Sequence, residues 1–503
     1  MSKKITTNTN IGSTGKATET DVRLFKVAEE DGIGNIEAIM WFRKKEEQEQ
    51  TEIVLDEKIE GFYLDALQVF ARVLAKRYGF TDLTDGRQIS LKTGTEPGEE
   101  IMVPWGKFSV PKINDAVFEP YVDLCRGQPV LKVRATVKRK YEDAVHEVFN
   151  YTRSKLSEWS IYRGKAVKVD FSEIKDLEQL KKAPIEDFAP GFFAVTENGL
   201  DQLMFSESVR EQVEDNLFFP IRHTKRVRKS DPDALNRGVL LAGPPGTGKS
   251  LTATHTAALA VENGWTFVLC SAKHLKQAYD FADRYQPAVV FCEDIDQVLG
   301  NVDPRTGEEV RNEEVDSYLN AMDSINTKDR EIITVCTTNH IERMGKTVLR
   351  HGRFHIAVPV LPPDAECIER LVRWYATERT GEWEIHRLPA DEDISNLCHM
   401  LAELKAVPAT IQEVVKRAKL KALASTSKND WVITAQQLET KARGMADHIA
   451  LLTPKPVDRR SDLEKAADSV ANAIQLAAGV NPEEKQSSGI SLSREAIDAY
   501  GIA

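Results

Sequence analysis

The sequence predicts an α/β protein in which a parallel sheet is followed by a small helical subdomain and preceded by a separate mixed α/β domain. Residues 190–361 alternate short apolar runs with helix-length segments, the pattern of a parallel sheet covered by helices. Residues 362–452 are mostly helical in pattern. Residues 21–185 combine helical periodicity with strand-like alternation, which indicates a domain of their own.

The amino-terminal region divides into a polar tail and a folded domain. Residues 1–20 have almost nothing to bury, so we expect them to be disordered. In residues 21–185, GFYLDALQVFARVLAKRYGF and EDAVHEVFNYTRSKLSEW place apolar residues at helical spacing, whereas LKVRATVK alternates apolar with polar residues. We interpret this region as a substrate or adaptor domain. Residues 453–503 are interpreted as a linker and carboxyl-terminal tail.

The composition indicates a globular chain of acidic total charge. Of the 503 residues, 41% are hydrophobic, and the net charge is -11. This charge gives no whole-protein attraction to nucleic acid or to an anionic membrane surface. No apolar run approaches a membrane span and the start lacks an apolar signal core, so we expect a cytoplasmic protein without membrane association. The six scattered cysteines form no CxxC pair, which favours buried free thiols.

Two basic stretches leave a nucleic-acid surface open as an interpretation. In LKVRATVK, the cations Lys132, Arg134 and Lys138 share one face of the predicted strand. The run HTKRVRK precedes the glycine-rich segment described next. The acidic total favours an ordinary solvated face for both stretches.

The stretch GVLLAGPPGTGKS is a short apolar strand followed by a glycine-rich loop. It matches G-x-x-x-x-G-K-[ST] and leads into the helical pattern SLTATHTAALAVEN. The glycines let backbone N–H groups turn toward phosphate oxygens, and the helix adds its positive end. Lys249 should reach the β- and γ-phosphates of ATP, and Ser250 should bind Mg²⁺. The candidate nucleotide-binding residues are Gly243, Pro244, Pro245, Gly246, Thr247, Gly248, Lys249, Ser250 and Leu251.

The stretch AVVFCEDID, Ala288 to Asp296, is an apolar run that ends in acid. A run without alternation suits a strand covered on both faces of a parallel sheet. Ligands of such sheets gather at the carboxyl ends of the strands, so these acids are expected beside the phosphate loop. There, one carboxylate would hold Mg²⁺ and the next would orient the attacking water.

The segments GPPGTGKS, VVFCEDID, CTTNH and LRHGRF occur in this order and resemble the motifs of the AAA clade of the AAA+ ATPases. The resemblance covers residues 190–452 and implies a P-loop NTPase sheet with a small helical lid. It also implies ATP hydrolysis with Mg²⁺ in a homo-oligomer, a hexameric ring. By this resemblance Asn339 would sense the γ-phosphate. Arg350 and Arg353 would be arginine fingers that reach the neighbouring subunit's nucleotide.

The order of the acids departs from the usual family pattern. The family has Asp then Glu, whereas this chain has Glu293 then Asp294. Because successive strand side chains point to opposite faces, we assign roles by position: Glu293 to Mg²⁺ and Asp294 to the water. The metal site would comprise Ser250, Glu293 and Asp294, with Asp296 as a nearby secondary acid. The reversed pair is similar to the branch of mitochondrial translocases that insert the Rieske iron–sulfur protein, here without their membrane helix.

Three further segments concern how neighbouring subunits, the pore and the lid of the predicted ring would act. LNAMDSI, with Met322 and Asp323, resembles the segment through which one AAA subunit senses its neighbour. The segment SAKHLKQAYDFADRYQPA lacks the aromatic–aliphatic–glycine loop of threading members. Tyr279 and Phe281 are candidate pore aromatics, but their spacing favours packing on the sheet. The lid segment has small residues, Ala409 and Thr410, where other AAA+ clades have a sensing arginine, so we assign none.

The sequence therefore predicts an ATP-hydrolysing ring ATPase that remodels or disassembles a protein or protein complex. A nucleic-acid-dependent motor or loader is one alternative, and nucleic acid is not the favoured partner. An ATP-gated assembly scaffold with slow turnover is another.

Overall fold

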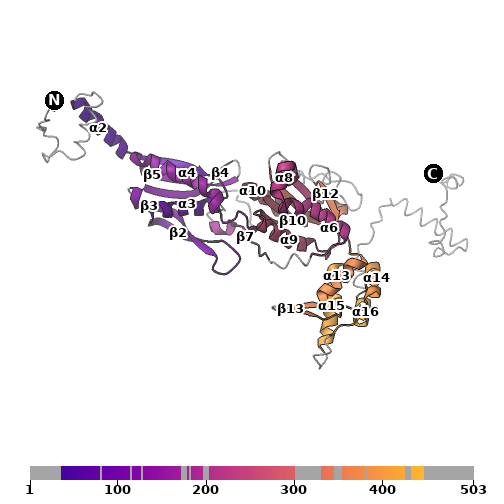
Figure 1. Ribbon diagram of the computed structural model, residues 1–503. Coiled ribbons are helices and arrows are strands. Elements are labelled where there is room, and N and C mark those ends of the chain that lie inside the picture. The colour runs from indigo at the N-terminus through magenta and orange to yellow at the C-terminus, as the bar shows by residue number, and fades with distance from the viewer. Residues whose placement is uncertain are drawn as a thin grey trace, which may run out of the picture.

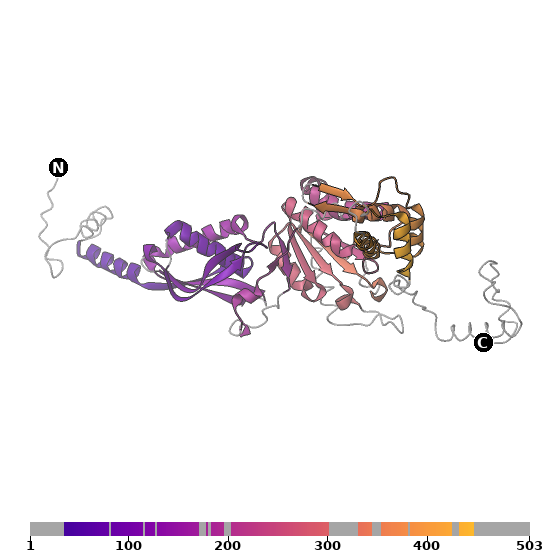
Figure 2. The same cartoon turned by 90° about the horizontal axis from the view of Figure 1, so that it is seen from below.

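The computed structural model shows an amino-terminal sheet domain, a larger parallel sheet and a helical lid that follow one another along the molecule (Figures 1 and 2). The structure describes residues 35–79, 82–113, 116–125, 128–170, 178–179, 183–195, 203–300, 330–344, 354–380, 383–424 and 432–446.

The amino-terminal domain is an antiparallel sheet covered on one face by two helices, α3 and α4. Within the described residues this sheet has five strands in the order β1-β5-β4-β3-β2. The alternation of LKVRATVK is confirmed, because Leu131, Val133 and Ala135 are fully buried toward the helices. The elements are α2 (Asn35–Gln50), β1 (Glu52–Ile59), α3 (Tyr63–Tyr78), β2 (Asp82–Lys92), β3 (Glu100–Val110), β4 (Ala116–Cys125), β5 (Gln128–Lys138) and α4 (Glu142–Trp159).

The second sheet confirms the predicted α/β class. In the part of the chain that the structure describes, it has seven strands in the order β12-β8-β11-β10-β9-β6-β7, and only the edge strand β7 runs antiparallel to its neighbour. Its strands are β6 (Ala166–Val169), β7 (Gly191–Phe192), β8 (Arg237–Ala242), β9 (Thr266–Ser271), β10 (Ala288–Glu293), β11 (Ile332–Thr338) and β12 (Ile356–Pro359). Its helices include α6 (Glu207–Val213), α7 (Phe219–Arg222), α8 (Thr224–Ser230), α9 (Lys249–Glu262), α10 (Leu275–Arg284) and α11 (Asp296–Leu299).

Strand β6 differs from the sequence interpretation, which placed residues 21–185 in the amino-terminal domain. Ala166–Val169 pairs in parallel with β9 and therefore belongs to the second sheet. The pairing joins segments about a hundred residues apart, and four residues carry too little periodicity to reveal it.

Helices α9 and α10 cover opposite faces of the second sheet. Val289 and Phe291 of β10 pack in the same cluster as the α9 residues, whereas Val290 and Cys292 pack in the cluster that contains α10. Strand β10 is therefore buried on both faces, as its unbroken apolar run predicts.

A buried carboxyl group joins the amino-terminal domain to the second sheet. Asp65 of α3 is 2% exposed. Its oxygens accept hydrogen bonds from Gln68 Nε2 (3.0 Å), Ser160 Oγ (2.6 Å), the Ile161 N–H (3.0 Å) and Tyr285 Oη (2.8 Å). Burial raises the pKa of Asp65, and the hydrogen bonds partly oppose this shift.

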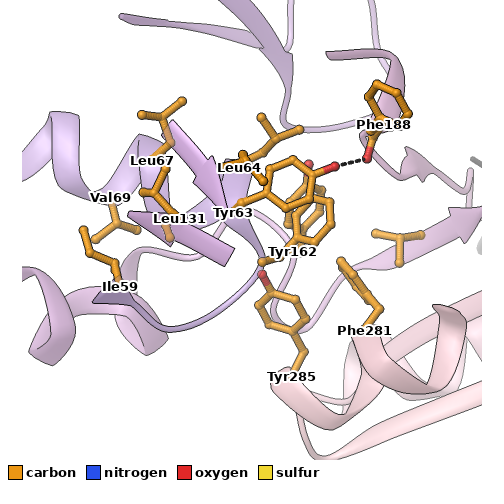
Figure 3. Packing of buried hydrophobic residues seen from close by; sticks show 14 of the residues in the cluster. Ile59, Tyr63, Leu64, Leu67, Val69, Leu131, Tyr162, Phe188, Phe281 and Tyr285 are labelled. Atoms are coloured by element: carbon orange, nitrogen blue, oxygen red, sulfur yellow. Dashed lines mark hydrogen bonds between the residues drawn. The ribbon is translucent and has the colours of Figure 1, made fainter. Parts of the chain in front are cut away.

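Aromatic side chains surround this joint (Figure 3). Tyr162 packs edge-on against Phe281 and Tyr285, with ring centroids 5.5 and 6.2 Å apart. Tyr63 Oη donates to the Phe188 carbonyl at 3.0 Å. Residues of α3 and of α10 thus share one hydrophobic cluster, so the two domains have a continuous core.

The lid follows β12 and packs around its own cluster. It contains a short hairpin of β13 and β14 as well as helices, which the mostly helical interpretation did not include. Its elements are α13 (Ala365–Ala376), β13 (Thr377–Thr380), β14 (Trp383–His386), α14 (Ser395–Glu403), α15 (Pro408–Leu423) and α16 (Ala435–Arg443).

Candidate nucleotide site

The phosphate loop lies between β8 and α9, at the carboxyl edge of the second sheet. Gly243 lies against Val360, the residue after β12, because a Cβ there would lie 2.0 Å from the Val360 carbonyl oxygen. Gly248 has a φ of 100° and caps the start of α9, a conformation that favours glycine. Ser250 is exposed in the first turn of α9, and Leu251 is half-buried beside it. The loop residues therefore have the strand–loop–helix context that the motif requires.

Lys249 lies largely buried within this loop. Its side chain is 6% exposed, and its Nζ donates to the Gly243 and Pro244 carbonyl oxygens, both at 2.7 Å. Desolvation lowers the pKa of Lys249 to about 8, and the carboxylates of Asp294 and Asp296 partly offset this shift. Both acids therefore lie close enough to act electrostatically on the lysine.

The acids of AVVFCEDID leave the sheet in different directions. Glu293 ends β10 and pairs with Ser271 of β9. Strand alternation places its side chain on the face of Phe291, which is the face that α9 covers. Asp294 follows in a turn with a φ of 50°. The roles assigned to Glu293 and Asp294 by position stay a prediction.

Residues at the end of β11 form hydrogen bonds with the acid turn, Asp294 to Asp296. Asn339 Nδ2 donates to Asp294 Oδ1 at 3.0 Å, and Thr338 Oγ1 donates to Asp296 Oδ1 at 2.8 Å. The Asp294 N–H donates to Thr337 Oγ1 at 3.1 Å. The structure thus brings Asn339 and the acids together, and it adds two threonines that the sequence reading did not single out. The signal was present as TTN directly after an apolar strand.

The donor set suits Mg²⁺ with a bound nucleotide. Ser250, Glu293 and Asp294 offer a hydroxyl and carboxylates, the hard oxygen ligands that Mg²⁺ prefers. Within the described ranges, no group of three or more His, Cys, Asp or Glu side chains could hold a metal ion by itself. Mg²⁺ is usually bound through one or two carboxylates together with substrate phosphates.

The lid contacts the phosphate loop directly. The Ala409 N–H at the start of α15 donates to the Gly246 carbonyl oxygen at 3.2 Å. A Cβ on Gly246 would lie 3.1 Å from Ala409 Cβ and 3.2 Å from Val407 Cγ2. On the other side of the loop, Phe205 lies beside Gly248. The residues at the start of α15 therefore pack closely against the phosphate loop.

The candidate pore aromatics are buried in the sheet domain. Tyr279 is 5% exposed and Phe281 is 2% exposed, and Tyr279 Oη donates to Thr334 Oγ1 of β11 at 3.0 Å. The interpretation that they pack on the sheet is confirmed. Both aromatics lie on α10, and the 3₁₀ turn Ala272–His274 joins β9 to this helix.

Two cations of LKVRATVK, Lys132 and Arg134, form ion pairs on the outer face of the amino-terminal sheet. Lys132 contacts Asp123 at 2.7 Å, and Arg134 lies within 3.9 Å of both Asp56 and Glu119. In the run HTKRVRK, Arg228 forms a forked ion pair with Glu331. The pairs of Lys132 and Arg134 favour the solvated-face interpretation for LKVRATVK.

Several predicted residues lie outside the described residues. They are Arg350, Arg353, Met322 and Asp323. The six cysteines are free, and all except the half-buried Cys125 are buried. No helix in the described part of the chain is long and apolar enough to span a membrane.

Comparison with known proteins places the same segment in a family. Residues 239–360 match the model of the ATPase family associated with various cellular activities (AAA). The chain is 32% identical over 206 residues to an ATP-dependent zinc metalloprotease YME1 homolog of Schistosoma mansoni, covering 39% of this chain and 29% of that protein. It is 30% identical over 250 residues to the ATP-dependent zinc metalloprotease FtsH of Caldicellulosiruptor bescii, covering 44% of this chain and 39% of that protein.

A third relative has a different description. Protein SAV of Sulfolobus acidocaldarius is 26% identical over 200 residues, covering 37% of this chain and 24% of that protein. The matched segments thus span between 24% and 39% of the length of these relatives. Residues 239–360 are therefore an AAA-family ATPase domain.

Proposed function

We propose that this chain hydrolyses ATP and uses the reaction to remodel a protein or protein complex. The observation that carries the proposal is the convergence of Lys249, Asp294 and Asn339 at one edge of the second sheet. In this arrangement Lys249 would bind the β- and γ-phosphates, and Asp294 would orient the attacking water with Asn339. Bound at Ser250 and Glu293, Mg²⁺ would neutralise phosphate charge.

Assembly into a homo-oligomeric ring, a hexamer, forms part of the proposal. Arg350 and Arg353 would act on the nucleotide of the neighbouring subunit, which makes turnover depend on assembly. The family and the names of its relatives support a protein rather than a nucleic acid as the substrate. The ion pairs on the outer face of the amino-terminal sheet support the same choice, because they neutralise Lys132 and Arg134. The cytoplasmic location remains a prediction.

Two of the relatives are named as zinc metalloproteases, and we do not propose peptidase activity for this chain. The sequence printed here contains no H-E-x-x-H motif, the usual zinc-binding pair of such enzymes. Its His146-Glu147 pair lies on α4 and is followed by Asn150 where the second histidine would stand.

Nucleotide binding by the wild type and by Lys249→Ala tests the proposal. The variant should lose ATP binding, because the loop lysine supplies the cation for the phosphates. Lys229→Ala, on the exposed surface of α8, is the matched control and should bind ATP as the wild type does. Retained ATP affinity in Lys249→Ala would contradict the phosphate-loop assignment. Turnover stimulated by DNA or RNA would favour the nucleic-acid alternative.

A further inference from the structure

The backbone of Asp294 has a conformation that few side chains tolerate. Its φ of 50° lies in the left-handed region, where asparagine and aspartate are the most frequent non-glycine residues. Strand β10 ends at Glu293, so the chain turns at the very residue proposed to orient water. A strained turn at a functional residue persists only where the surroundings hold it.

Thr337 accepts two backbone hydrogen bonds from this turn. Its Oγ1 accepts the Asp294 N–H at 3.1 Å, and its carbonyl oxygen accepts the Ile295 N–H at 2.9 Å. Thr337 is 3% exposed and lies near the carboxyl end of β11, where its backbone is fixed by pairing with β8. A hydroxyl and a carbonyl from one rigid residue therefore satisfy successive N–H groups of the turn.

The direction of the Thr337 side chain fits this role. Ile333 and Val335, which alternate with it along β11, pack in the cluster on the α9 side, so Thr337 faces the phosphate-loop side of the sheet. Thr338 faces the opposite side and bonds Asp296. The Thr338 carbonyl oxygen also accepts the Gly243 N–H at 3.2 Å. The end of β11 thus fixes the acid turn relative to the phosphate loop.

We propose that Thr337 is a positioning residue for ATP hydrolysis, which it serves by locking the left-handed turn that aims the Asp294 carboxylate. The inference rests on the proposed function of Asp294. It accounts for the reversed acid order, because aspartate tolerates this backbone better than glutamate. The left-handed turn also compensates for the shorter side chain of aspartate, because the backbone rather than the side-chain length sets the position of the carboxylate.

The variant Thr337→Val tests the inference, because valine keeps the shape and strand preference of threonine but cannot accept the Asp294 N–H. We expect kcat to fall about 10- to 100-fold, the scale expected for a small misplacement of a reacting group. KM and the ATP dissociation constant should stay near the wild-type values, because the phosphate loop is untouched. Thr337→Ser retains the hydroxyl and should restore most of kcat.

The matched control is Thr334→Val, the same replacement on the same strand. Thr334 is 4% exposed, and its hydroxyl accepts a hydrogen bond from the Tyr279 hydroxyl, away from the acid turn. The kcat of Thr334→Val should therefore match that of the wild type. Thr337→Ala gives a second route if the valine variant does not fold, and the same loss of kcat is expected. Thermal unfolding of each variant establishes that folded protein is compared.

The outcomes separate this inference from the proposed function. Wild-type kcat in Thr337→Val or Thr337→Ala would overturn the positioning role. An equal loss in Thr334→Val or in Thr337→Ser would overturn it too, because it would show general damage to β11. A wild-type chain that does not hydrolyse ATP, or an Asp294→Asn variant that hydrolyses it normally, would instead overturn the function on which the inference rests.

Discussion

Asn339 Nδ2 donates a hydrogen bond to Asp294 Oδ1 across 3.0 Å, which joins the side chain after β11 to the side chain after β10. The amide leaves one carboxylate oxygen of Asp294 for another partner. It also keeps its own carbonyl oxygen, which can accept from a water. These two side chains can therefore hold a water between them in the way that the proposed hydrolysis requires.

Removal of this amide should slow the chemical step. We expect Asn339→Ala to lower kcat about 10²-fold, the usual cost of deleting one preorganised donor, while ATP still binds. The comparison is steady-state turnover beside the Asn263→Ala control, whose amide only caps the end of α9. An Asn339→Ala variant with wild-type kcat would show that the contact has no part in hydrolysis.

The ATP affinity should depend on pH through Lys249. The free site has a lysine pKa of about 8, so the amine is protonated below that pH and increasingly neutral above it. Bound phosphates favour the ammonium form, so binding above pH 8 takes up a proton, and the affinity falls by up to about tenfold per pH unit. Below pH 8 this lysine contributes no pH dependence.

Calorimetric titration in two buffers of different ionisation enthalpy measures this proton uptake. Near pH 9 the binding of ATP should be accompanied by the uptake of close to one proton. Near pH 7 Lys249 is already protonated, so it should contribute little proton uptake. Equal uptake at both pH values would mean that the lysine pKa in the free protein is not lowered.

The usual family order of acids should be worse in this chain. The double variant Glu293→Asp/Asp294→Glu places glutamate at a φ of 50° and lengthens the side chain by one methylene. We expect a loss in kcat of at least about tenfold, because the backbone is strained and the carboxylate is displaced. Single-turnover hydrolysis measures the chemical step directly. A rate at or above the wild-type value would show that the turn adapts freely.

The joint between the domains should contribute measurably to stability. Tyr285→Phe removes one hydrogen bond to the buried Asp65, and we expect it to lower the free energy of unfolding by about 1–3 kcal/mol. Tyr121→Phe is the control, because it also removes a tyrosine hydroxyl bonded to an aspartate, Asp56, but on the exposed sheet face. We expect a change below about 0.5 kcal/mol there.

Urea denaturation of both variants gives this comparison. Equal small effects in the two variants would mean that the Asp65–Tyr285 contact does not stabilise the joint. A larger loss in Tyr121→Phe would contradict the account in the same way.

Local patterns predicted much of the fold. The strand–loop–helix context of Lys249 and the unbroken apolar run of β10 are visible within a short window, so the phosphate loop and the acid strand could be read directly. The helices α3 and α4 and the strand β5 followed from their periodicity. The burial of Tyr279 followed from its helical spacing.

The remaining features depend on pairing between distant segments. The contact between Thr337 and Asp294 requires the register of β10 against β11, which no local pattern sets. Asp65 reads as an ordinary polar residue on a helix, because its partner Tyr285 lies 220 residues away. Strand β6 joins the second sheet through β9 for the same reason.

The central claim is tested most directly by ATP turnover of the wild type and of Asp294→Asn, with the nucleotide retained by each protein counted. The account predicts that the wild type hydrolyses ATP, whereas the variant retains ATP and does not turn it over. Turnover by Asp294→Asn at the wild-type rate would contradict the assignment of Asp294 as the acid that orients the attacking water.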